Sequence, residues 1–77
     1  MNDALIQLFA EVLQVDPAEL NDNSSPDNLK EWDSLAAMNL VVAIEEKFRV
    51  RLSTKEIMKM STIGLARKTL QRKEVAV

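Results

Sequence analysis

Apolar residues recur at three- and four-residue intervals along this chain, and no segment alternates apolar with polar residues as a half-buried strand would. Over residues 3–15 the apolar positions that share one helix face are Leu5, Leu8, Phe9, Val12 and Leu13. Over residues 33–48 the corresponding positions are Ala37, Leu40, Val41, Ile44 and Phe48. This periodicity predicts an all-α protein.

Capping signals predict where the later helices begin. Asp33 is a good N-cap residue for the helix over 33–48, and Ser53 with Glu56 matches a capping box that opens a short third helix. That helix is expected to use three apolar contacts, Ile57, Met58 and Met60. A fourth helix is expected from residue 61 or 62 to about residue 72, with Ile63, Ala66 and Leu70 on its inner side.

The first connection is long and rich in turn-forming residues. Asp16-Pro17 is expected to end the first helix, because proline cannot continue a helix. Residues 16–33 then carry Asp, Asn, Ser and Pro, punctuated by three expected core anchors, Leu20, Leu29 and Trp32. The expected fold is a small four-helix bundle with a long first loop and a short third helix, built as one domain over residues 1–77.

The helix over 33–48 has a second set of apolar residues away from its core stripe. Leu35, Met38 and Val42 follow an i, i+3, i+7 spacing on a different face from Leu40 and Ile44. Two interpretations remain open. The helix is buried on two sides, or the second face is exposed and binds a partner, since exposed apolar clusters tend to mark interaction sites.

Composition excludes most enzyme chemistry. The chain has no cysteine and no histidine, so thiolate nucleophiles, zinc sites, Ser-His-Asp triads and Cys-His dyads are absent. We therefore expect no catalytic residue, no metal site and no enzyme activity of its own. Any reactive group must come from another molecule.

Charge is divided unevenly along the chain. Residues 1–46 hold ten acidic and one basic side chain, whereas residues 47–77 hold nine basic and two acidic ones. The basic segment has no aromatic residue beyond Phe48 for bases to stack upon, so nucleic-acid binding is not expected. The amino terminus lacks a signal-peptide pattern, and no apolar run approaches the roughly 20 residues of a membrane span. We expect a cytoplasmic monomer.

The segment Trp32-Asp33-Ser34-Leu35 and the residues around it resemble the acyl carrier protein family, including its peptidyl and aminoacyl carrier relatives. The resemblance is carried by DSLAAMNLVVAIEEKF, continues through VRLSTKEIMKMSTIGLA, and extends back through LQVDPAELND. It implies that Ser34 bears 4′-phosphopantetheine, transferred from coenzyme A, with Asp33 and Leu35 beside the attachment point. The start of a helix suits this role, because free N–H groups and the helix dipole favour a phosphate there.

The resemblance also implies partners. A phosphopantetheinyl transferase and acyl-loading, elongating or acyl-transferring enzymes are expected to bind Leu35, Met38, Val42, Glu45 and Glu46. For Glu45 and Glu46 the alternative is ordinary solvated helix surface. Trp32 is expected to be a core anchor, and its functional alternative is to border the arm or its cargo.

Some positions depart from the usual pattern of fatty-acid carriers. Ala36 and Asn39 are neutral where those carriers usually expose acids, and Arg49 and Arg51 occupy a turn that is often acidic or neutral. These departures favour a free-standing carrier of acyl or aminoacyl thioesters in a specialised pathway rather than housekeeping fatty-acid synthesis. The alternative from another class is an unmodified helical protein-interaction module.

Overall fold

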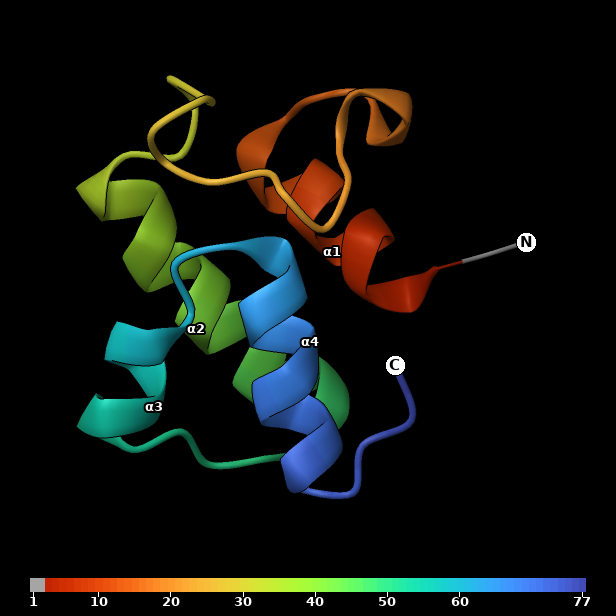
Figure 1. Ribbon diagram of the computed structural model, residues 1–77, viewed down its shortest axis with the longest axis vertical. Coiled ribbons are helices and arrows are strands. Elements are labelled where there is room, and N and C mark those ends of the chain that lie inside the picture. Colours follow the sequence, from red (N-terminus) through yellow and green to blue (C-terminus); the bar gives the residue numbers. More distant parts are fainter. Residues whose placement is uncertain (1–2) are drawn as a thin grey trace.

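The computed structural model describes residues 3–77, which form four α-helices and one 3-10 turn and contain no strand (Figure 1). The helices are α1 (Ala4–Leu13), α2 (Ser34–Phe48), α3 (Thr54–Lys59) and α4 (Ile63–Arg72), and the 3-10 turn η1 spans Pro17–Glu19. α1 packs against α2 and α4, and the short α3 packs against α4. The predicted all-α bundle with a long first loop and a short third helix is confirmed. Within the described range, no helix combines the length and apolarity needed to cross a membrane.

One hydrophobic core joins the helices. Its largest fully buried side chains come from α1, α2 and α4 and are Leu5, Phe9, Ile44, Ile63 and Leu70. The predicted inner side of α4 is confirmed, because Ala66 is also fully buried. Burying such side chains is worth about 1.5–3 kcal/mol each, so a few of them dominate the stability of a domain this small.

The first helix ends for a reason that differs from the predicted one. Gln14 adopts left-handed backbone angles (φ 58°, ψ 47°), and the N–H of Val15 donates to the carbonyl of Ala10 over 3.1 Å. These features form a helix C-cap in which the chain turns away from the axis. Pro17 lies beyond this cap and opens η1, where Asp16 and Glu19 form a capping box. The predicted proline stop is therefore wrong, and the helix ends before Val15.

The long first loop is held against the core, as predicted. Leu20 and Trp32 are buried and Leu29 is partly buried against the core. The rings of Trp32 and Phe9 meet edge to face, with centroids 5.2 Å apart and an interplanar angle of 62°. Such a pair adds about 0.5–1.5 kcal/mol to the effect of burial.

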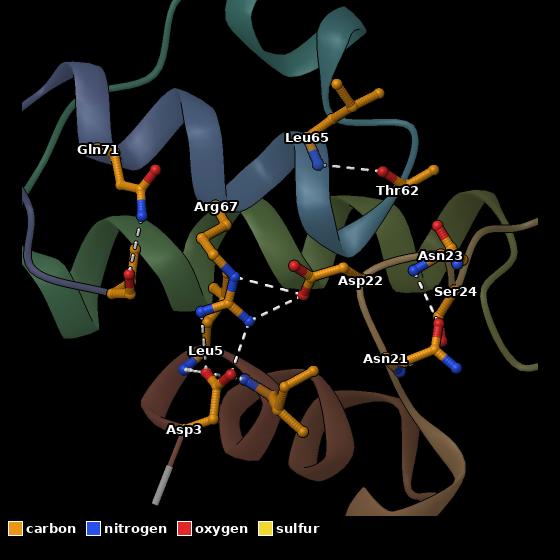
Figure 2. Close-up of polar contacts among 12 residues, drawn as sticks. Asp3, Leu5, Asn21, Asp22, Asn23, Ser24, Thr62, Leu65, Arg67 and Gln71 are labelled. Atoms are coloured by element: carbon orange, nitrogen blue, oxygen red, sulfur yellow. Dashed lines mark hydrogen bonds and ion pairs between the residues drawn. The ribbon is translucent and has the colours of Figure 1, made fainter.

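The loop is also tied to α4 by polar contacts (Figure 2). The Arg67 guanidinium forms ion pairs with Asp3, the N-cap of α1, at 2.7 Å and with Asp22 in the loop at 3.0 Å. The Gly64 N–H donates to the carbonyl of Asp22 over 2.9 Å, and a β-carbon at Gly64 would lie 3.0 Å from that same oxygen. The hydrogen bond from Arg67 holds the pKa of Asp3 below its ordinary value. Together these contacts join α1, the loop and α4.

Candidate functional site

Ser34 is the first residue of α2 and is exposed. Asp33 is the N-cap, as predicted, and its Oδ1 accepts a hydrogen bond from the Ala36 N–H over 2.9 Å. The Asp33 carboxylate thus satisfies one of the N–H groups that a helix start leaves without an intrahelical acceptor. This local arrangement fixes where α2 begins and leaves the Ser34 hydroxyl at the positive end of the helix dipole. A phosphate ester on Ser34 therefore fits this position.

The chain lacks the two residue types that most often activate a serine hydroxyl or hold a zinc ion. It contains no histidine and no cysteine. In the part of the chain that the structure describes, no group of three or more Asp and Glu side chains is arranged to hold a metal ion. The residues around Ser34 can position a phosphate ester at the start of α2.

The outer apolar face of α2, defined as Leu35, Met38 and Val42, is uncovered. Leu35 and Met38 are each 69% exposed and Val42 is 54% exposed. Ala36, Leu40 and Ile44 are buried on the opposite side of the helix. The interpretation that α2 is buried on two sides is therefore wrong.

A shallow groove runs beside the outer apolar face, between α2 and α3. Its volume is about 270 Å³, and its lining is apolar: Ala37, Met38, Val41, Val42 and Ile57. A much smaller cavity, of about 40 Å³, shares three of these residues and reaches inward to Phe9 and Trp32. Apolar surface beside a free helix face is the usual composition of a protein-binding patch.

Ala36 differs from its expected position. The family pattern groups it with Asn39 as a neutral residue on the exposed side of the helix, yet it is 9% exposed and belongs to the core cluster. Asn39 is exposed, as expected. Ala36 precedes Leu40 by four residues, which is one helix turn, so the two side chains share the inner face. Its neutrality therefore reflects packing and carries no information about partner charge.

The two glutamates of α2 differ from each other. Glu46 is exposed, whereas Glu45 is partly buried and its Oε2 accepts a hydrogen bond from the Leu52 N–H over 2.9 Å. Glu45 therefore has a structural function that the sequence did not indicate, since it holds the chain that leads from α2 to α3. Its second oxygen has no protein partner among the hydrogen bonds formed by residues 3–77.

Trp32 and α3 complete the surroundings of the site. Trp32 is 5% exposed, which confirms its predicted function as a core anchor. Trp32 also lines the small inner cavity. That it borders the arm or its cargo stays a prediction. Of the three apolar contacts predicted for α3, Met60 is buried, Ile57 is half-exposed and Met58 is 77% exposed. The prediction for Met58 is wrong, because Ile57 and Met60 share one face of this short helix and Met58 falls outside it.

Comparison with known proteins gives one consistent result. Residues 3–66 match a family model described as a phosphopantetheine attachment site. The acyl carrier protein of Chlamydia caviae is 33% identical over 64 residues, which cover 83% of this chain and 83% of that protein. The acyl carrier protein of Wolinella succinogenes is 34% identical over 62 residues, which cover 80% of this chain and 82% of that protein.

The fold agrees with the sequence matches. The solution NMR structure of holo acyl carrier protein from Geobacter metallireducens superposes with a TM-score of 0.75 at 33% identity, covering 94% of this chain and 87% of that chain. The matched range 3–66 includes Asp33, Ser34 and the whole of α2. This chain belongs to the acyl carrier protein family, whose members are non-catalytic carriers with a phosphopantetheine attachment site.

Proposed function

We propose that Ser34 is the residue of this acyl carrier protein that bears the phosphopantetheine arm, with Asp33 and Leu35 flanking the attachment point. The observation that carries the proposal is the position of Ser34, exposed at the first residue of the fifteen-residue helix α2. No other serine has this combination. Ser24 and Ser25 are buried, and the Ser53 hydroxyl accepts the Glu56 N–H in the cap of α3.

The arm supplies a thiol, which carries acyl groups as thioesters. The chain itself supplies the place of attachment and the surface that partners bind. The Ser34 oxygen forms the new bond to phosphorus and loses its proton, and the nucleotide part of coenzyme A leaves. We assign the base for this step to the transferase.

We further propose that the transferase and the acyl-loading, elongating or acyl-transferring enzymes dock on the outer apolar face. Three large apolar side chains more than half exposed on one helix support this, as does the apolar groove beside them. Glu46 is exposed near the carboxyl end of α2, one helix turn beyond Val42, and is available for a partner. Glu45 contributes less freely, because one of its oxygens is bonded to Leu52.

We propose a specialised pathway as the setting of this carrier. The support is narrower than the sequence alone suggests, because Ala36 belongs to the core and no longer counts. Asn39, Arg49 and Arg51 remain as exposed departures from the usual acidic pattern. The cytoplasmic location, the monomeric state and the single domain over residues 1–77 stay predictions.

The test is the mass of the intact protein after incubation with coenzyme A and a broad-specificity phosphopantetheinyl transferase. We expect a gain of one phosphopantetheine group, and no gain for Ser34→Ala. Ser61→Ala is the matched control, since Ser61 is also exposed and should leave the gain unchanged. Modification that persists in Ser34→Ala would reject the assignment. A folded wild-type chain that gains no mass would favour the unmodified interaction module.

A further inference from the structure

The end of α2 that lies away from Ser34 is bordered by two arginines. Arg49 is the C-cap that directly follows α2, and its side chain lies near Val42 of the outer apolar face. Arg51 follows in the turn that leads to α3. Both side chains line one open hollow of about 370 Å³, together with Val42, Glu45, Glu46 and Val50.

The two arginines are available for a partner. Both are exposed, and the ion pairs formed within residues 3–77 involve other cations, namely Arg67 and Lys73. Of the two acids in the same hollow, Glu45 is partly buried and bonded to Leu52, which leaves Glu46 as the exposed acid. The exposed charge at this end of α2 is therefore mainly positive.

The neighbouring helix adds to this charge. Lys55 and Lys59 of α3 are exposed and form no ion pair within the described residues, whereas the acid of α3, Glu56, is paired with Lys73 at 3.0 Å. Met58 lies between the two lysines in sequence and is itself highly exposed. Cationic side chains therefore flank exposed apolar surface on both α2 and α3.

The opposite end of α2 has the opposite charge. Glu31 and Asp33 are exposed immediately before Ser34, and with one exposed cation beside them, Lys30, the net charge of residues 30–33 is negative. A helix of fifteen residues is about 22 Å long, so the acidic and basic ends are separated by more than a Debye length at physiological salt. A partner lying along α2 therefore meets two distinct fields, one at the attachment point and one at the far end.

We propose that partner enzymes cover the far end of α2 with an acidic surface segment, whose carboxylates meet Arg49 and Arg51 while an apolar side chain contacts Met38 and Val42. This inference rests on the proposed function, because it names the chemistry of the enzymes that dock on the outer apolar face. Arginine suits the contact, since its planar guanidinium binds carboxylates through two parallel hydrogen bonds. Complementary charge would raise the association rate and fix the direction in which the partner lies.

Cations at this end of α2 could also serve the fold alone, and Arg49 offers a way to distinguish that explanation from binding of an acidic partner. Cations near a helix C-terminus are stabilised by the helix dipole. However, Arg49 is the C-cap of α2 and has left-handed backbone angles (φ 54°, ψ 51°), which favour glycine. If Arg49 served only the fold, glycine would serve better at this position.

The test uses the full chain carrying its arm, labelled with ¹⁵N, and two synthetic amphipathic helical peptides. The peptides share one apolar face and differ only in their flanking residues, glutamate in one and lysine in the other. We expect the glutamate peptide to shift the amide signals of Met38, Val42 and Arg49 and to bind about 5-fold tighter at low salt. The difference should shrink as salt is added, because ions screen exposed charges.

Two variants and one control sharpen the result. The double variant Arg49→Glu, Arg51→Glu should reverse the preference between the peptides. Lys68→Glu is a control for charge reversal elsewhere on the surface, because Lys68 is exposed on α4 and forms no ion pair within residues 3–77. It should leave the preference intact. Arg49→Gly should keep or raise Tm and still weaken binding of the glutamate peptide.

Equal binding of the two peptides, a preference for the lysine peptide, or no shift with either peptide would overturn the proposal. The proposed function is tested separately, because the mass of the intact protein shows whether Ser34 accepts the arm before any peptide is added. If Ser34 accepts the arm and the peptides are not distinguished, only the acidic partner is rejected. If Ser34 does not accept the arm, the same titration on the unmodified chain still tests the basic end.

Discussion

The two sides of this bundle expose different chemistry. Where the first loop crosses α4, the contacts are polar and mutually satisfied, with Arg67 joined to Asp3 and Asp22. Where α2 faces outward beside α3, large apolar side chains such as Met38 and Met58 are left in water. The first side holds the chain together. The second side leaves apolar surface unburied, which is expected of a surface that other proteins cover.

The largest test of this comparison is made within α2 itself. Leu40→Ala and Ile44→Ala remove fully packed side chains and should each cost about 2–5 kcal/mol of unfolding free energy. Met38→Ala removes a side chain that is already in water and should cost less than about 0.5 kcal/mol. Urea unfolding of the three variants measures both effects. Equal losses at all three positions would mean that the outer apolar face also supports the fold.

A carboxylate placed on each side of α2 sharpens the comparison. Ala36→Asp places a charge in the core cluster and should lower the free energy of unfolding by about 1–3 kcal/mol, because the buried carboxylate loses hydration and gains no hydrogen-bond partner. Asn39→Asp makes the same change in net charge at an exposed position and should leave Tm nearly unchanged. Thermal unfolding followed by circular dichroism distinguishes the two. Similar Tm values would place residue 36 on the solvent side.

The polar side should show its contribution in acid. Because Arg67 lowers the pKa of Asp3 in the folded chain, the stabilisation is present above the unfolded pKa of about 4 and is lost as pH falls through the folded pKa. Asp3 and Asp22 are partly exposed, so Arg67→Gln should cost only about 0.5–1 kcal/mol at pH 7. The Tm difference between the wild type and this variant should therefore hold from pH 7 to about pH 5 and shrink as the pH falls below about 4.

Glu56 provides the control for that measurement. The pKa of Glu56 is also lowered, first by the Ser53 backbone N–H and then by Lys73. Protonation of Glu56 in acid therefore also lowers the stability of the folded chain, as protonation of Asp3 does. Glu56→Gln should therefore leave the Arg67-dependent part of the acid loss intact. A Tm difference for Arg67→Gln that stays constant from pH 7 to pH 3 would show that the ion pairs with Asp3 and Asp22 contribute nothing.

Local signals explain which parts of the fold could be predicted. The N-cap at Asp33 and the capping box of Ser53 and Glu56 depend only on residues three apart, and both are identified correctly from the sequence. The end of α1 is not, because Gln14 takes left-handed angles that its residue type does not indicate. The loop anchors are recognisable because isolated Leu20 and Trp32 stand out in a polar segment.

The errors at the site have two origins, a misleading correspondence to related carriers and packing between distant residues. Ala36 is misplaced by its correspondence to a position in related carriers, although its spacing from Leu40 and Ile44 is a sufficient indication of the inner face. Glu45 binds the backbone seven residues ahead, and Ser24 and Ser25 are buried by the path of the whole loop. Neither arrangement can be inferred from a local pattern. For Leu35, Met38 and Val42 the sequence leaves two alternatives, a buried face or an exposed one. Their high exposure in the folded chain decides between them.

Trp32 has one more consequence, which is optical. It is the only tryptophan of a chain without tyrosine, and it is buried against Phe9 two residues before Ser34. Excitation of indole therefore reports on a single known point, and shielding from water places its emission at short wavelength. Lifting of the loop from α1 would shift that emission to longer wavelength. The chain thus contains a label-free fluorescence reporter close to Ser34, the proposed attachment point, and it is suited to following folding and partner binding in real time.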